Sequence, residues 1–244
     1  MINPDQSTPG IYPFGVYGAI SETLSLFTRN LWLITRIVVV VVAPFEIFTA
    51  LNVEDPTNQW ELSLWSFLLG AACNMLVAPA LIYSLMKVLQ TGKSAGVRES
   101  YSWGLTKLVK LSICALIAAV VQTLGYALCV IPGIIVTLSF AVVYPIAVLE
   151  KGSVNEVFAR SLELTRGHRL EILIVYILLG IIMLIPAALC GFVIGIANFF
   201  PVTVVASIAS DVFEHLFTVL SLFLYLSLPR TSKTGSYTVL SLSK

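Results

Sequence analysis

Three ionisable residues near the carboxyl end of the chain have the spacing that places side chains together on a helix. Asp211 precedes Glu214 by three residues and His215 by four, so in a helix all three lie on one face. Two carboxylates and an imidazole in that arrangement could bind a metal ion or relay protons. A water-filled vestibule, or a helix end held by salt bridges, would use the same three residues. Both interpretations are open at this point.

The rest of the sequence contains no recognisable catalytic or metal-binding pattern. A zinc site would need one more ligand, and the only other histidine, His168, lies in a distant segment. There is no HExxH, GxSxG, P-loop or GxGxxG pattern, and no serine has a histidine and an aspartate nearby in an arrangement that suggests a catalytic triad. The four cysteines form no CxxC pair, which is typical of small apolar packing residues. We therefore expect a protein that is not an enzyme and that holds no metal and no cofactor.

The composition indicates whether most of the chain is surrounded by water or by lipid. Hydrophobic residues make up 58% and charged residues 11% of the 244 positions, whereas soluble domains carry roughly 25% charged residues. Several apolar runs are about 20 residues long, which at about 1.5 Å per residue matches the hydrocarbon core of a bilayer. A net charge of +1 argues against a nucleic-acid partner, because no basic excess is present to neutralise phosphates. The sequence predicts an all-α, polytopic membrane protein.

The apolar runs define six expected transmembrane helices. Cys129 and Val130 separate two of the runs so narrowly that the helices on either side must form an antiparallel hairpin. The other runs pair in the same way, which predicts three hairpins in a single domain over residues 14–229, between a flexible lead at 1–13 and a polar tail at 230–244. The six expected helices cover about residues 31–51, 62–89, 108–128, 131–149, 170–189 and 202–228.

A polar segment before each hairpin is expected to form a short amphipathic helix on the cytoplasmic side, at residues 14–29, 90–107 and 153–166. In the third segment, Ser153 and Glu156 match a capping box, and Gly167 can end the helix in the left-handed conformation. We expect one face of this helix to carry Val154, Val157, Phe158, Ser161, Leu162 and Thr165, and the other Asn155, Glu156, Arg160, Glu163 and Arg166.

Charges are distributed unequally over the two sides of this pattern. All 14 lysines and arginines fall on one side, whereas the opposite side carries Glu54, Asp55 and Glu61. Because positively charged loops stay in the cytoplasm, we expect both termini there, in a bacterial inner membrane. The basic residues expected to contact headgroups or a protein partner are Arg29, Arg98, Lys107, Arg160, Arg166 and Arg169.

Ionisable residues within the spans are the default functional candidates, because placing one in a bilayer costs about 3 kcal/mol or more. Glu46, which follows Pro44 in the first span, joins the three residues near the carboxyl end. The candidate intramembrane polar site therefore consists of Glu46, Asp211, Glu214 and His215.

Several strings of the sequence resemble a known family. IPGII at 131–135, VLEKG at 148–152 and RSLELTRGHR at 160–169 are similar to the integral-membrane domain found beside some bacterial glycerophosphodiester phosphodiesterases, and to related uncharacterised inner-membrane proteins without an enzyme. YGAISETLSLFTRN near the start and LFLYLSLPR near the end extend the resemblance over most of the chain. That family usually has an acidic residue near the final basic residue, where Ser227 and Leu228 stand here. The resemblance implies the membrane architecture but no activity, because the enzyme of the fused proteins is a separate soluble domain.

These observations favour a non-catalytic membrane protein that serves as an assembly, anchoring or lipid-organising module. Membrane lipids are the expected partners, and a protein partner in the membrane or on the cytoplasmic face is an alternative. Two further hypotheses stay open. One is a small transporter or channel-like protein with an outward acidic cavity, and the other is an accessory subunit of a larger membrane complex.

Overall fold

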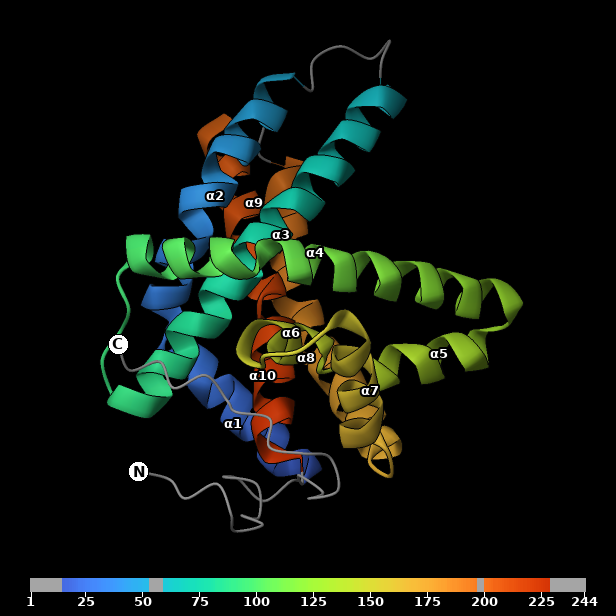
Figure 1. Cartoon of the computed structure of the whole chain (residues 1–244). Coiled ribbons are helices and arrows are strands. Elements are labelled where there is room, and N and C mark those ends of the chain that lie inside the picture. Colours follow the sequence, from blue (N-terminus) through green and yellow to red (C-terminus); the bar gives the residue numbers. More distant parts are fainter. Residues whose placement is uncertain (1–14, 53–58, 197–199, 229–244) are drawn as a thin grey trace.

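The computed structural model describes residues 15–52, 59–196 and 200–228. Within these ranges the chain forms ten helices and no strand (Figure 1), which confirms the all-α prediction. The predicted lead and tail, and the acidic residues Glu54 and Asp55, lie outside the described residues. The helices are α1 (Val16–Arg29), α2 (Leu31–Asn52), α3 (Gln59–Thr91), α4 (Val97–Leu128), α5 (Val130–Ser139), α6 (Val143–Leu149), α7 (Val154–Thr165), α8 (Arg169–Ile196), α9 (Phe200–Glu214) and α10 (Leu216–Ser227).

Six helical stretches are long and apolar enough to cross a membrane. Their number is the one that the sequence predicts, so the chain has the helices of a multi-pass membrane protein. The stretches are Leu31–Leu51, Phe67–Thr91, Val97–Leu128, Val130–Leu149, Arg169–Ile196 and Pro201–Ser227.

Two of these stretches consist of two helices each, where the sequence predicted continuous spans. The fourth breaks over residues 140–142, between α5 and α6. Pro145 explains this break, because it has no N–H to donate and its ring clashes with the carbonyl of Ala141, four residues earlier. The sixth breaks at His215, between α9 and α10, and no proline lies near that position.

The polar segments before the hairpins also differ from one another. α1 and α7 are separate helices, as expected, and the predicted capping box of α7 is present, with Ser153 and Glu156 each accepting from the other's backbone N–H. Gly167 follows α7 with a φ of +91°, the left-handed conformation predicted for it. In contrast, the predicted separate helix within 90–107 is wrong. Residues 97–107 continue without a break into the third candidate span as α4, since no proline interrupts them.

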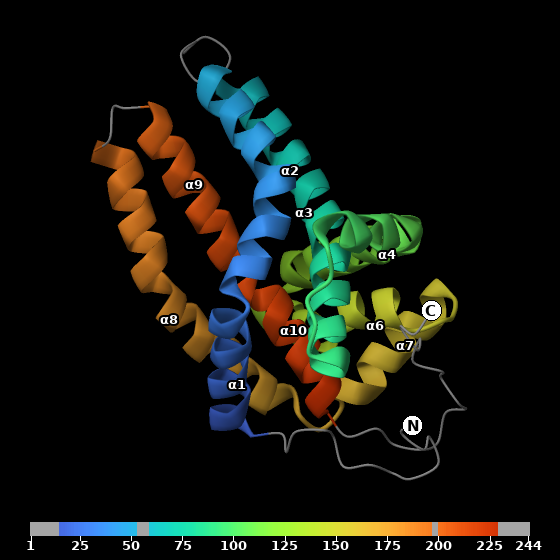
Figure 2. The same ribbon diagram turned by 90° about the vertical axis from the view of Figure 1, so that its left-hand side faces the viewer.

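The helices point in two main directions. α2 packs on α3 and on α9, and α8 packs on α9; Figure 2 shows these four rising together, with the ends of α2 and α8 at the same end of the molecule. The pair α4–α5 instead runs across them, with the connection between the two helices to one side in Figure 1. This pair is tightly closed, because a Cβ on Gly125 would lie 3.1 Å from the Cα of Gly133. The arrangement of all six as three membrane hairpins stays a prediction.

α6 and α10 form the centre of the packed core. Every residue of α6 except Tyr144 is buried, and so is most of α10. The two helices contact each other, α10 also contacts α1 and α3, and α6 also contacts α3, α4 and α7. The short helices that follow the two breaks therefore hold the longer helices together.

Candidate functional site

The break between α5 and α6 frees two backbone carbonyls, and hydroxyl groups from other helices bind both. The Val143 amide donates to Phe140 instead of Ser139, and Pro145 cannot donate to Ala141. Ser161 Oγ of α7 donates to the Ser139 carbonyl at 2.7 Å. Ser221 Oγ of α10 donates to the Ala141 carbonyl at 2.6 Å. These hydrogen bonds hold α7 and α10 against the helix break. They also satisfy the two backbone carbonyls, whose burial without a donor would cost free energy.

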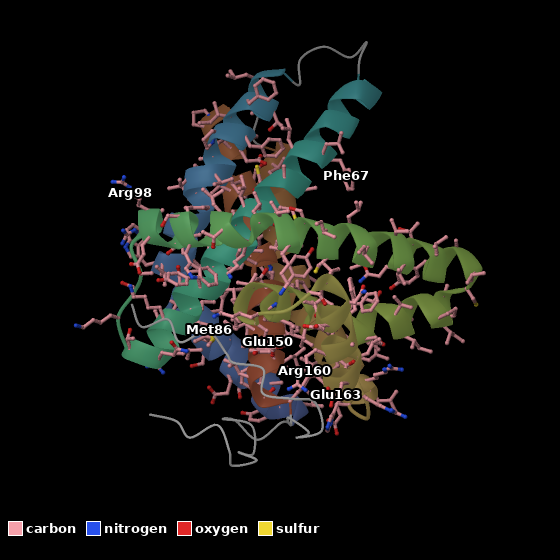
Figure 3. All side chains as sticks on the ribbon, in the orientation of Figure 1. Phe67, Met86, Arg98, Glu150, Arg160 and Glu163 are labelled. Carbon is pink, nitrogen blue, oxygen red and sulfur yellow. The ribbon has the colours of Figure 1, made fainter. Side chains whose placement is uncertain are left out.

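A buried carboxylate lies at the end of α6. Glu150 is 6% exposed, and its Oε1 accepts a hydrogen bond of 2.9 Å from Tyr225 Oη of α10. Its backbone carbonyl accepts from Lys110 Nζ of α4 at 3.0 Å. Because a buried charge is tolerated only when it is paired and hydrogen-bonded, these contacts fix α4, α6 and α10 at one point. Figure 3 shows Glu150 in the interior, below α4.

The four residues of the predicted intramembrane site are only partly brought together. Glu46 of α2 and Glu214 lie close enough to Asp211 of α9 to interact with it electrostatically, and the Glu46 side chain hydrogen-bonds Ser207. His215, in contrast, is 3% exposed, and its Nδ1 lies 3.5 Å from Thr218 Oγ1. Among the described residues, no group of three His, Cys, Asp or Glu side chains has a geometry that would hold a metal ion.

The predicted basic contacts are spread over several places. Arg29 and Arg98 are exposed at the end of α1 and in the first turn of α4, and Figure 3 shows Arg98 at the outer edge of the molecule. The Lys107 ammonium lies 5.7 Å from the centre of the Trp103 ring, within range of a cation–π contact.

Arg160 differs from its predicted position on the polar face of α7. It is 7% exposed, and its Nη1 lies 2.9 Å from Glu163 Oε2, beside which Figure 3 places it. The i,i+3 spacing allows the two side chains to pair while the arginine is covered. Arg160 therefore serves the packing of α7 and is not exposed to a partner.

Arg166 and Arg169 lie together at the turn between α7 and α8. They line a cavity of about 370 Å³ with Ala159, Leu162 and Glu163, and we call it the elbow cavity. The left-handed Gly167 shapes the turn. The sequence placed both arginines near headgroups, but only the structure shows that they share a cavity.

Comparisons with protein-family models, with curated proteins and with solved structures find no match to this chain. The resemblance to the membrane domain of the glycerophosphodiester phosphodiesterases therefore stays an expectation from the sequence.

Proposed function

We propose that the chain is a non-catalytic integral membrane protein that organises or anchors lipids at the cytoplasmic face of a bacterial inner membrane. The proposal rests on how exposed apolar and basic side chains are distributed over the surface. Val109 and Leu116 on α4 are 73% and 67% exposed, as suits contact with lipid tails. Arg29 and Arg98 are exposed at helix ends, where guanidinium groups can attract anionic headgroups.

The interior supports the same proposal. Several of the polar groups that the core encloses join helices, as with Ser161, Ser221 and the Glu150–Tyr225 pair. Groups held in this way stabilise a scaffold, because their donors and acceptors are already engaged.

The proposal predicts that anionic lipid is enriched around the protein. The chain would be reconstituted into vesicles of equal parts phosphatidylcholine and phosphatidylglycerol, with bromine atoms on the acyl chains of one lipid at a time. Trp32, which is 74% exposed at the start of α2, serves as the fluorescent reporter once Trp60, Trp65 and Trp103 are replaced by phenylalanine. Brominated phosphatidylglycerol is expected to quench more strongly, with an enrichment of about fivefold at low salt, because each basic residue near the surface favours anionic lipid by about 1 kcal/mol. The difference should shrink at high salt.

Equal quenching by the two lipids would contradict the proposal. A stoichiometric protein that stays bound through gentle purification would instead support an accessory subunit.

The electrostatic contact between Glu46 and Asp211 favours the transporter as the second candidate. An ion flux into vesicles that Asp211→Asn abolishes would support it.

A further inference from the structure

The elbow cavity has the size and position of a headgroup site. Its volume of about 370 Å³ falls in the range of small-ligand pockets, which is about 300–1,000 Å³. It lies where α7 ends and where α8, a candidate span that begins at Arg169, starts. The end of a transmembrane helix is the depth at which lipid headgroups lie.

The charge of the cavity is positive. Arg166 is exposed and Arg169 is half-buried, and in the part of the chain that the structure describes neither arginine forms a salt bridge. The one carboxylate among the lining residues, Glu163, pairs with Arg160 at 2.9 Å. Glu171, in the first turn of α8, has its Oε2 3.1 Å from His168 Nδ1. The two arginines are therefore available to an anion from outside the chain.

One of these arginines has a buried donor that still needs an acceptor. Arg169 Nε is buried and has no hydrogen-bond partner among the described residues, and a buried donor without a partner costs about 1–3 kcal/mol. A guanidinium group binds a phosphate with two parallel hydrogen bonds, which a single oxygen acceptor could not match. The first backbone N–H groups of α8 add a partial positive charge at the same turn.

The walls of the cavity favour a lipid over a free phosphate. Leu162, which lines it, is 42% exposed, and Leu170 beside it is 76% exposed. Beyond them, Ile174 and Ile177 continue along α8 with 46% and 52% exposure. A phosphate held by the arginines would therefore have an apolar helix surface next to it, on which acyl chains can lie.

On the basis of the function proposed above, we infer that the elbow cavity binds the phosphodiester headgroup of one anionic phospholipid, with Arg166 and Arg169 on the phosphate and the acyl chains along α8. This names a specific site within the general preference for anionic lipid.

The test counts the phosphatidylglycerol molecules that stay bound when the purified chain is moved through detergent, using native mass spectrometry. The parent chain is expected to retain one. Arg166→Gln with Arg169→Gln should weaken its binding about thirtyfold, as two surface charges do. Lys93→Gln with Lys151→Gln is the matched control, since it removes the same charge from exposed positions elsewhere and should leave the bound lipid in place. Arg166→Lys with Arg169→Lys keeps the charge and should show an intermediate loss, which separates binding from misfolding.

The outcomes distinguish this inference from the function on which it rests. If the elbow variant keeps its lipid while brominated phosphatidylglycerol still quenches preferentially, the elbow site is wrong and the lipid-organising function stands. If both double variants lose lipid equally, the binding is general and the site is again overturned. Glycerol 3-phosphate and inorganic phosphate are added as competitors, and displacement of the lipid by either at equal concentration would identify a soluble phosphate as the ligand.

Discussion

Tyr225→Phe is expected to lower the free energy of unfolding by about 1.5–3 kcal/mol, the range for losing a hydrogen bond to a charged group. The substitution removes only the hydroxyl that donates to Glu150 Oε1 at 2.9 Å and leaves the ring in the core. Because Glu150 is 6% exposed, water has little access to replace the lost donor. The carboxylate then stays buried with one partner fewer. Unfolding in mixed micelles by increasing denaturing detergent, followed by circular dichroism, measures the change.

Tyr126→Phe is the matched control for this experiment. Its hydroxyl lies 3.1 Å from Thr137 Oγ1 in an exposed position between α4 and α5, so the same atom is removed from an ordinary contact. Hydrogen bonds between membrane helices average about 0.6 kcal/mol, and we expect a loss of that size. Equal losses for the two tyrosines would show that the Glu150 contact is not a special stabiliser of the core.

Replacing Ser161 and Ser221 together with alanine is expected to cost about 1–3 kcal/mol at the Ala141 carbonyl, which loses its donor, and a smaller amount at the Ser139 carbonyl, which keeps the weaker contact from Thr165. The Ser161 hydroxyl donates a hydrogen bond to the Ser139 carbonyl, and the Ser221 hydroxyl donates one to the Ala141 carbonyl. The two acceptors belong to the same helix break, but the donors come from α7 and α10. The same detergent titration measures each single variant and the pair.

The two single variants should differ in a defined order. Thr165 Oγ1 already lies 3.4 Å from the Ser139 carbonyl and can take over when Ser161 is lost, whereas no second donor to the Ala141 carbonyl is present among the described residues. Ser221→Ala should therefore cost more than Ser161→Ala. Ser102→Ala, which removes an exposed hydroxyl bonded within its own helix, should stay within about 0.5 kcal/mol. A double variant no less stable than Ser102→Ala would rule out the proposed role of the hydroxyls.

Local patterns in the sequence predicted local structure well. The number of apolar helices follows from run length alone. The capping box of Ser153 and Glu156 and the left-handed Gly167 need only their neighbours along the chain, and both are present. The narrow link at Cys129 likewise joins α4 and α5 as expected.

The helix breaks and the contacts around them depend on parts of the chain that no local pattern connects. Glu150 and Tyr225 are 75 residues apart, and neither has a neighbour in the sequence that indicates its partner. The sequence did contain one indication of these contacts, because Ser161 and Thr165 fall on the otherwise apolar face of α7. Hydroxyls on a buried face imply an acceptor nearby, and Pro145 identifies the Ala141 carbonyl as one that its own helix cannot satisfy.

The direction of the α4–α5 pair also could not be predicted from the sequence. Apolar content shows that a helix suits lipid, but the angle between helices is set by packing at their contacts. The pair runs across the other long helices (Figure 1), and this makes its path through the membrane the most informative feature to measure.

The proposed function depends above all on six spans with the basic end of the molecule in the cytoplasm. Cys129, exposed at the tip of α4–α5, can report this once Cys73, Cys114 and Cys190 are replaced by alanine. A second variant of that background carries Cys129→Ala and Ser94→Cys, in the exposed connection between α3 and α4. With a thiol reagent that cannot cross membranes, we expect Cys129 to be labelled in intact cells, and the cysteine at position 94 only after permeabilisation. Labelling of Cys129 only after permeabilisation would contradict the six-span account, because α4–α5 would then lie on the cytoplasmic side.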